Sequence, residues 1–259
     1  MRIRLIETET FSGAFNMAAD ELLLNKVAEK RDFVSLRFYK WQKPTLSFGH
    51  NQKPEEIILP EKVKAAGFSA VKRKSGGKML LHDKEYTFSI GMTREFILEK
   101  IKPESSITFL EMFKFAMTPL LKGLQLSGIP VYFADRTDKP DRSHIHCYTE
   151  AAGHSIFAKG KKLIGAAALY SGKTLFIHGA IPLKSTPLPP NIFINPQSEC
   201  EDIPMTSLNE FLSAEEIINV PQNIAQAFGE ELLLNLFSEP FTEDESKKVE
   251  SMSKKYIFC

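Results

Sequence analysis

The first half of the chain alternates between short stretches with strand patterning and longer stretches with helical patterning. Polar and apolar residues that alternate, or short apolar runs between turn residues, are typical of β-strands. Five stretches have this character: residues 2–7, 33–40, 45–49, 69–73 and 79–92. Apolar residues spaced three and four positions apart predict helices over residues 14–30, 60–66 and 107–126. Pro119, inside the last of these, is expected to kink or split that helix.

The second half predicts a β-meander followed by a helical end. Strands are expected over residues 154–159, 162–170 and 173–181, separated by turns. Residues 184–205 contain five prolines and predict an irregular connection. Helix starts are indicated by three capping-box patterns: Ser207 with Glu210, Ser213 with Glu216, and Thr242 with Glu245. Pro221 is predicted to open a helix at its first position. This layout favours an α+β or α/β layer fold.

Composition narrows the class of protein. The 259 residues are 43% hydrophobic, enough for one large domain or for a domain with a small appendage. Because 33 basic residues balance 32 acidic ones, net charge gives no reason to expect nucleic-acid binding. No apolar stretch approaches the roughly 20 residues that span a bilayer, and the N-terminus has no signal-peptide pattern. Three cysteines without a spaced framework favour a reducing compartment, so we expect a cytoplasmic protein.

A basic loop that contains two adjacent glycines follows the strand predicted at 69–73. Gly76 and Gly77 stand among Arg73, Lys74 and Lys78. Adjacent glycines let the backbone approach a ligand closely or adopt positive φ, and the basic residues suit a phosphate or carboxylate-like group. The glycine spacing is not that of a Walker loop, and a simple turn is the alternative interpretation.

Cys147 is the candidate nucleophile. A thiol is reactive as its thiolate, and nearby cations lower its pKa from about 8.5. His144, His146, Lys161 and Lys162 are the cations close to it in sequence. Two alternatives stay open, a buried structural cysteine and a metal site formed by His144, His146 and Cys147, although no second ligand cluster follows.

Lys162 begins an otherwise apolar strand that continues into Gly165 and three alanines. A lysine there can reach into a pocket lined by small residues and place its ammonium near a carbonyl oxygen. A solvated turn lysine is the alternative. His82 and His178 stand near apolar strands, where a structural histidine is the simpler interpretation.

Three polar residues lie on the helix predicted at 14–30. Asn16 is a candidate cap for this helix. Asp20 and Glu21 suit the positive N-terminal end of the helix dipole, which explains them without a functional role.

Taken in order, these motifs resemble the biotin/lipoate protein ligase and octanoyltransferase family over nearly the whole chain. The resemblance rests on the first-helix motif and the strand pair after it, the glycine loop, the lysine segment and the strand that follows. These segments are Asn16-Met17-Ala18-Ala19-Asp20-Glu21, residues 41–49 (WQKPTLSFG), Arg73-Lys74-Ser75-Gly76-Gly77 with Leu81-His82-Asp83, Lys161-Lys162-Leu163-Ile164-Gly165, and His178-Gly179-Ala180-Ile181-Pro182-Leu183. The chain departs from the family pattern at Ala166-Ala167-Ala168, where the family usually has Ser-Ala-Gln, which leaves the polarity of the pocket open.

The resemblance implies an α+β fold of mixed sheets with flanking helices. An acyltransferase catalytic domain is expected over residues 1–205, with a short helical C-terminal extension, 206–259, packed on it. Cys147 precedes Lys162 by 15 residues, which agrees with the octanoyltransferases of the LipM type, the branch that the chain resembles most. In that branch the resemblance makes Cys147 and Lys162 catalytic. The resemblance assigns substrate binding to Arg73, Gly76, Gly77, His82 and Gly165.

The activity implied is transfer of an octanoyl group, through a thioester on Cys147, to a lysine of a lipoyl domain. Octanoyl-acyl carrier protein would be the donor; the glycine-cleavage H protein and the lipoyl domains of 2-oxoacid dehydrogenases would be acceptors. No cofactor, metal, nucleic acid or membrane is implied. The alternatives are an ATP-dependent lipoate–protein ligase, an amidotransferase between lipoyl domains, and a non-enzymatic metal-binding module.

Overall fold

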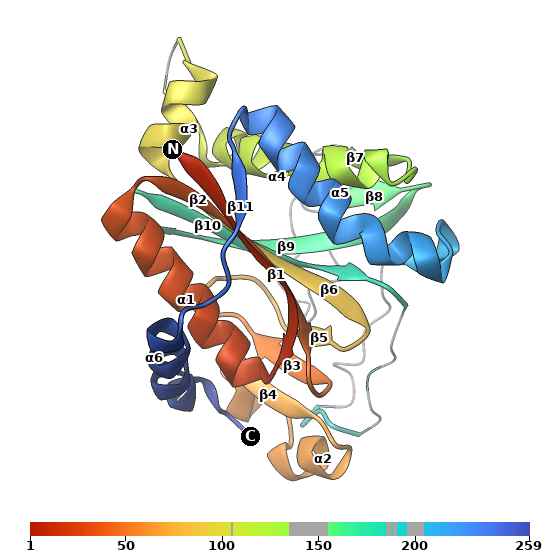
Figure 1. Cartoon of the computed structure of the whole chain (residues 1–259). Coiled ribbons are helices and arrows are strands. Elements are labelled where there is room, and N and C mark those ends of the chain that lie inside the picture. The colour runs from red at the N-terminus through yellow and green to blue at the C-terminus, as the bar shows by residue number, and fades with distance from the viewer. Residues whose placement is uncertain (105, 135–154, 185–187, 189–190, 196–204) are drawn as a thin grey trace.

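A large β-sheet forms the centre of the computed structural model (Figure 1). The structure describes all residues except 105, 135–154, 185–187, 189–190 and 196–204. The eight strands of this sheet, in spatial order, are β11 (Leu236–Ser238), β1 (Arg2–Phe11), β2 (Phe33–Trp41), β6 (Glu85–Thr93), β10 (Thr174–Pro182), β9 (Lys161–Ser171), β8 (Ile156–Ala158) and β7 (Val131–Phe133). Strand β1 pairs in parallel with β2 and β11, and the other neighbours are antiparallel.

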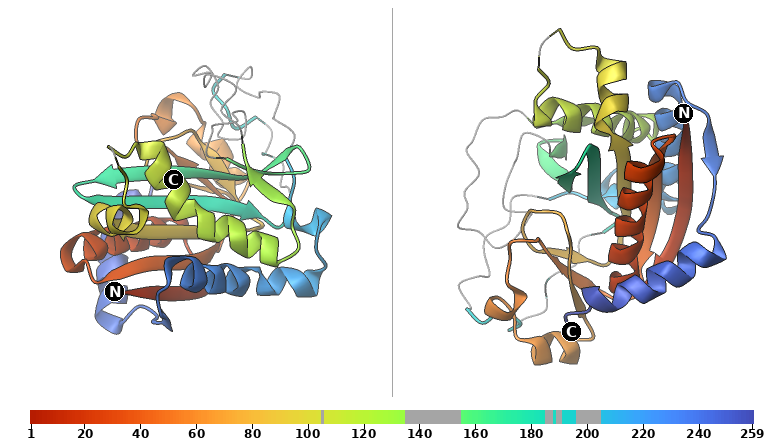
Figure 2. Two further views of the ribbon diagram at one scale, coloured as in Figure 1. Left: turned by 90° about the horizontal axis from the view of Figure 1, so that it is seen from above. Right: turned by 90° about the vertical axis from the view of Figure 1, so that its left-hand side faces the viewer.

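Helices cover both faces of the large sheet, and a three-stranded sheet lies beside it. The small sheet has the order β4 (Ser69–Lys72), β3 (Thr45–Phe48), β5 (Leu80–His82). The helices are α1 (Gly13–Lys30), α2 (Pro60–Ala65), α3 (Arg94–Ile101), α4 (Phe109–Leu126), α5 (Ala214–Leu232) and α6 (Glu243–Ser253), with single 3₁₀ turns at Pro54–Glu56, Leu208–Glu210 and Lys254–Tyr256. Figures 1 and 2 show α4 and α5 on one face, and α1 with α6 on the other. This mixture of sheets and flanking helices confirms the α+β prediction. None of the described helices is long and apolar enough to span a bilayer.

Alternate residues of the central strands serve two different environments. Even-numbered positions of β2 and β6 and odd-numbered positions of β10 enter the large hydrophobic core under α4 and α5, as Leu36, Phe88 and Ile177 do. The intervening positions face α1, and they include buried polar side chains: Arg37, Ser89 and His178. Period-two patterning, which predicted these strands, therefore also separates the structural core from the polar face where the candidate site lies.

Several local predictions need correction. Pro221 lies inside α5, because the confirmed capping box of Ser213 and Glu216 starts this helix seven residues earlier. Pro119 does not split α4, which runs unbroken from Phe109. Ser207 caps the 3₁₀ turn Leu208–Glu210 as a helix start but makes no side-chain cap bond, so the first proposed capping box is wrong. The box of Thr242 and Glu245 is confirmed. The stretch 79–92 forms two strands, β5 and β6, and α3, β7 and β11 were not predicted.

The C-terminal segments contact the rest of the chain at several places. Gly123 of α4 lets α5 approach closely, because a Cβ there would lie 2.3 Å from the Cα of Ile224. Strand β11 extends the large sheet beside β1. After α6, the amide of Phe258 donates to the carbonyl of Ala70 on β4, and the Ala70 amide donates to the carbonyl of Cys259. The end of the chain thus pairs with the strand that leads into the basic glycine loop (Figure 1).

A buried ion pair between α6 and β1 predicts pH-dependent stability. Glu245 accepts hydrogen bonds from both terminal nitrogens of Arg4, at 2.8 and 2.7 Å, and lies 2.6 Å from the Lys26 ammonium. Burial alone would raise the pKa of Glu245, but the bonds from Arg4 and Lys26 lower that pKa to about 2. A carboxyl group with a lower pKa in the folded state stabilises the protein at pH values above its ordinary pKa. This stabilisation is lost as the pH falls toward the folded-state pKa.

We therefore expect Glu245→Gln to lower the free energy of unfolding at pH 7 by about 2 kcal/mol. The difference from wild type should shrink between pH 5 and pH 2, as urea unfolding at several pH values would measure. Glu243→Gln is the matched control on the same helix, because Glu243 is exposed and pairs only with Lys247 among the ion pairs recorded. A Glu245→Gln deficit that stays constant from pH 7 to pH 3 would contradict the role of this carboxylate.

Candidate functional site

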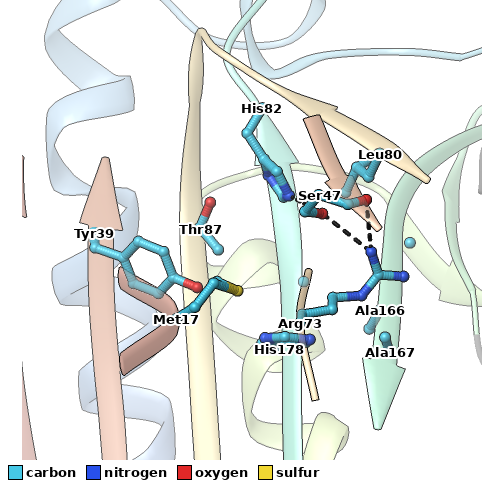
Figure 3. A pocket seen from close by; sticks show the side chains of 12 residues that line it. Met17, Tyr39, Ser47, Arg73, Leu80, His82, Thr87, Ala166, Ala167 and His178 are labelled. Carbon is cyan, nitrogen blue, oxygen red and sulfur yellow. Dashed lines mark hydrogen bonds between the residues drawn. The ribbon is translucent and has the colours of Figure 1, made fainter. Parts of the chain in front are cut away.

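A cavity, here called the first cavity, lies between the large sheet, the small sheet and α1 (Figure 3). It encloses about 350 Å³, part of which is open to solvent. Its lining residues are Met17, Tyr39, Ser47, Arg73, Leu80, His82, Thr87, Gly165, Ala166, Ala167, His178 and Gly179. Small and apolar residues thus alternate with a few fixed polar groups, which suits a ligand that is mostly apolar with one polar end. Three predicted binding residues, Arg73, His82 and Gly165, meet here.

Arg73 shapes the glycine loop at the rim of this cavity. Its Nη1 donates to the carbonyl of Ser47 at 2.8 Å and to the Ser47 hydroxyl at 3.1 Å. Its Nη2 donates to the carbonyls of Gly76 at 3.0 Å and Lys78 at 2.7 Å. The buried guanidinium therefore ties β3 to the loop that follows β4, a bridging role that needs the planar fork of an arginine.

Gly76 and Gly77 of this loop do not line the first cavity. Close contacts within the loop nevertheless require glycine. Gly77 has φ +90°, and a Cβ there would lie 2.9 Å from Nη2 of Arg73. A Cβ on Gly49 would lie 1.9 Å from the carbonyl oxygen of Gly77. Gly49 and Gly77 therefore permit a close backbone approach, and any direct contact of Gly76 and Gly77 with a substrate remains a prediction.

His82, another lining residue of the first cavity, is held by a chain of polar contacts. Its Nδ1 lies 2.6 Å from Oε1 of Glu85, and its Nε2 lies 2.8 Å from the hydroxyl of Ser47, which also contacts Arg73. Trp41, the single tryptophan of the chain, stacks on the imidazole with ring centroids 4.1 Å apart. These contacts fix the ring as a wall of the cavity and connect it to Arg73.

Asp20 of α1 organises a second buried network. Arg37, Ser89 and His178 stand side by side across β2, β6 and β10. All three contact the Asp20 carboxylate: the Arg37 guanidinium at 2.8 Å, the Ser89 hydroxyl at 3.0 Å and Nδ1 of His178 at 3.2 Å. Burial acts to raise the pKa of Asp20, but the bond from His178 and the charge of Arg37 outweigh it, so this pKa lies below its ordinary value. Asp20 is therefore a buried anion.

The His178 imidazole extends this network to the glycine loop. Its Nε2 lies 2.5 Å from the Ser75 hydroxyl. Burial lowers the pKa of His178, in spite of the neighbouring Asp20. A neutral ring with its Nδ1 proton directed to Asp20 has an Nε2 that accepts from Ser75. The loop is thereby held at two points, by Arg73, which bonds to Gly76 and Lys78, and by Ser75 through His178.

The interpretation of the helix polar residues from sequence was wrong in two respects. Ser12, not Asn16, caps α1, and Asn16 is buried with its side-chain oxygen 2.6 Å from Nη2 of Arg37. Asp20 and Glu21 are buried centres of ion pairs, not charges placed for the helix dipole. An arginine within the apolar stretch FVSLRFYK was the available signal, because a buried arginine requires a buried partner. Patterning also gave no indication that Met17 and Thr87 line the cavity.

Of the two predicted catalytic residues, the structure describes Lys162 but not Cys147. Lys162 lies near the start of β9, is buried, and precedes Gly165 by three residues, but it is not a lining residue of the first cavity. Its carbonyl accepts from the Thr206 amide at 3.0 Å, so the chain after the proline-rich connection returns to this point. Cys147 lies outside the described residues, as do His144 and His146, so their roles stay predictions. Among the described residues, no cluster of His, Cys, Asp and Glu could hold a metal ion.

Comparisons with known proteins agree with the fold. The profile described as the lipoyl protein ligase A/B catalytic domain matches residues 12–229. Among curated relatives, octanoyltransferase LipM of Bacillus cereus is 33% identical over 179 residues, covering 67% of this chain and 62% of the relative. The chain therefore matches less than two thirds of that relative's length. Octanoyltransferase LipM of Kyrpidia tusciae is 28% identical over 271 residues, covering 98% of this chain and 96% of the relative.

Solved structures place the fold in the same group. A lipoate-protein ligase A bound with ATP aligns with a TM-score of 0.75 at 20% identity, covering 98% of this chain and 95% of the other. The putative lipoate protein ligase Ta0514 from T. acidophilum, with bound lipoic acid, aligns with a TM-score of 0.71 at 20% identity and covers 98% and 94% of the two chains. These alignments establish a shared architecture.

Proposed function

Because this chain belongs to the lipoyl protein ligase A/B catalytic-domain family, we propose that it is an octanoyltransferase of lipoate assembly, with Cys147 as the acyl carrier. The donor is octanoyl-acyl carrier protein, and the acceptor is a lysine of a lipoyl domain, such as that of the glycine-cleavage H protein or of a 2-oxoacid dehydrogenase. The relatives named octanoyltransferase LipM support this activity over lipoate ligation.

The reaction proceeds in two balanced steps. The Cys147 thiolate attacks the carbonyl of the octanoyl thioester on the carrier, and the carrier thiolate leaves and takes up a proton. The acceptor lysine, as its neutral amine, then attacks octanoyl-Cys147, forms the amide and loses a proton, and the Cys147 thiolate leaves. Two successive transfers through one enzyme nucleophile give ping-pong kinetics. Lys162 stabilises the thiolate of Cys147 and the oxyanion that develops in each step.

The observation that carries this proposal is the position of Lys162 relative to the first cavity. Lys162 is buried near the start of β9, and Gly165, Ala166 and Ala167 of the same strand line the cavity. An acyl chain that starts near the ammonium can therefore run along β9 over residues without bulky side chains. Burying seven methylene and methyl carbons at about 0.8 kcal/mol each offers about 6 kcal/mol of binding energy. That energy favours an eight-carbon apolar substrate in this cavity.

Intact mass spectrometry after mixing with octanoyl-acyl carrier protein tests the proposal. The expected result is one octanoyl adduct that hydroxylamine removes and that peptide mapping places on Cys147. Cys200→Ser and Cys259→Ser are matched controls, and both should keep the adduct. Without any nucleotide, the adduct should pass to a lipoyl domain. Transfer of free lipoate that requires ATP, with no adduct on Cys147, would identify a ligase and contradict the proposal.

A further inference from the structure

A second cavity adjoins the first, on the far side of Met17. It spans about 300 Å³, part of which is open to solvent, and is lined by Met17, Asp20, Glu21, Leu24, Arg73, Lys74, Ser75, Leu169, Phe176, His178 and Tyr256. The linings of the two cavities have three residues in common: Met17, Arg73 and His178. These three side chains therefore form the partition between the two spaces.

The second cavity continues the path of the first along the same strands. The first cavity meets β9 at Gly165–Ala167, and the second meets β9 at Leu169 and β10 at Phe176, which is the pairing partner of Leu169. At about 3.3 Å per strand residue, these two sets of contacts lie about 7 Å apart along β9. An acyl chain that starts near Lys162 and fills the first cavity would thus point its methyl end at the partition.

The second cavity suits an apolar ligand despite its charged residues, because those charges have partners. The Glu21 carboxylate accepts from the Tyr256 hydroxyl at 2.7 Å and pairs with Lys74 and Lys255. Asp20 is held by Arg37 and His178. Apolar side chains supply the remaining surface: Leu24, Leu169 and Phe176.

Two members of the partition are fixed, and the third is adaptable. Arg73 makes four hydrogen bonds to β3 and its own loop, and His178 is held between Asp20 and Ser75. Met17 projects from α1 as an unbranched apolar side chain, drawn in Figure 3 between Tyr39 and His178. A methionine fills irregular space and can be replaced by smaller or larger residues. The size of residue 17 is therefore the variable that determines whether the cavities are separate.

We propose that Met17 sets the upper limit on acyl length, and that the second cavity is a latent binding site for the distal carbons of longer saturated acyl chains. This inference rests on the proposed function for its substrate class, an acyl group held in the first cavity. Removing the Met17 side chain joins the two cavities into one channel, and enlarging it shortens the first cavity.

The experiment measures acyl-length preference for wild type, Met17→Ala and Met17→Phe. Acyl-carrier substrates of six to fourteen carbons are compared by adduct formation. Binding of the corresponding free fatty acids is followed in parallel by the fluorescence of Trp41, whose ring stacks on His82 of the first cavity. For Met17→Ala, the ratio of dodecanoyl to octanoyl kcat/KM should rise about tenfold or more, since one methylene in an apolar pocket is worth at least that factor. For Met17→Phe, octanoyl should fall about tenfold relative to hexanoyl.

Leu24→Ala is the matched control, because Leu24 lies on α1 and lines the second cavity without belonging to the partition. It should keep the wild-type length profile, and a shift equal to that of Met17→Ala would overturn the partition. If wild type forms the octanoyl adduct but neither Met17 variant changes the length profile in either assay, Met17 is not the limit. If no adduct forms and fatty-acid binding still shifts as expected, the partition stands and the proposed function fails. Should Met17→Ala not fold, the opposite shift of Met17→Phe decides.

Discussion

Lys162→Met is expected to reduce octanoyl transfer by a factor of about 100 to 1,000, the usual cost of removing one group that stabilises an oxyanion. Methionine is unbranched, apolar and similar in length, so a buried site on β9 can accept it without a cavity. The substitution removes the positive charge and leaves the strand intact. If the ammonium also stabilises the thiolate, as the proposed mechanism requires, the pKa of Cys147 should rise at the same time. Steady-state transfer rates, and alkylation of Cys147 as a function of pH in a Cys200→Ser and Cys259→Ser background, measure the two effects.

The neighbouring lysine provides the control. Lys161 belongs to the same strand, but its side chain is 46% exposed and its ammonium lies 3.1 Å from the carboxylate of Glu210. Lys161→Met removes the same charge one residue away and should leave both the transfer rate and the alkylation profile near those of wild type. Equal rates for Lys162→Met and wild type would show that the chemistry needs no ammonium at position 162.

Strand prediction from the sequence succeeded where a strand has one apolar and one polar face. On β2, the apolar positions Leu36 and Phe38 enter the core, and Arg37 and Tyr39 face α1. The failures have physical causes. Strands β7 and β11 have three residues each, too few to show a period, and β11 is defined by pairing with β1 more than 220 residues away in sequence. Pro221 was predicted to start a helix. Sequence pattern alone does not distinguish a proline in the first turn of a helix from a proline inside a longer helix that tertiary packing stabilises.

The site was predictable in its parts but not in its connections. Motif resemblance selected Arg73, His82 and Gly165, which meet at one cavity although they come from both sheets. Residues that act through distant partners were missed: Asp20 gains its role from Arg37, Ser89 and His178, the last of which lies 158 positions later. Met17 was not identified as a cavity residue, because a cavity wall and a core position present the same apolar pattern along a helix. Its function depends on the space on either side, which no one-dimensional pattern records.

Asp20→Ala is expected to lower the free energy of unfolding by about 3–5 kcal/mol, because it leaves a buried cation without its counter-ion. Arg37 is buried, and in wild type its guanidinium lies 2.8 Å from the Asp20 carboxylate. The substitution also removes the acceptor for the His178 ring. Since the folded-state pKa of Asp20 is lowered, wild type gains this stability at neutral pH and loses it as pH falls, so the difference should narrow in acid. Urea unfolding at pH 7 and at acidic pH measures both the size and the trend.

Tyr39→Phe separates the ion pair from the rest of the Asp20 network. The Tyr39 hydroxyl donates to Asp20 at 2.9 Å, and the ring lies 4.0 Å from the Arg37 guanidinium carbon, measured to the ring centroid. Phenylalanine keeps that ring contact and the anion, so only one neutral donor is lost, at a cost of about 1 kcal/mol. If Asp20→Ala costs no more than Tyr39→Phe, Asp20 contributes only as a hydrogen-bond acceptor. A larger loss of unfolding free energy that shrinks in acid requires a buried anion that holds Arg37. The same anion is connected through His178 and Ser75 to the glycine loop at the rim of the first cavity.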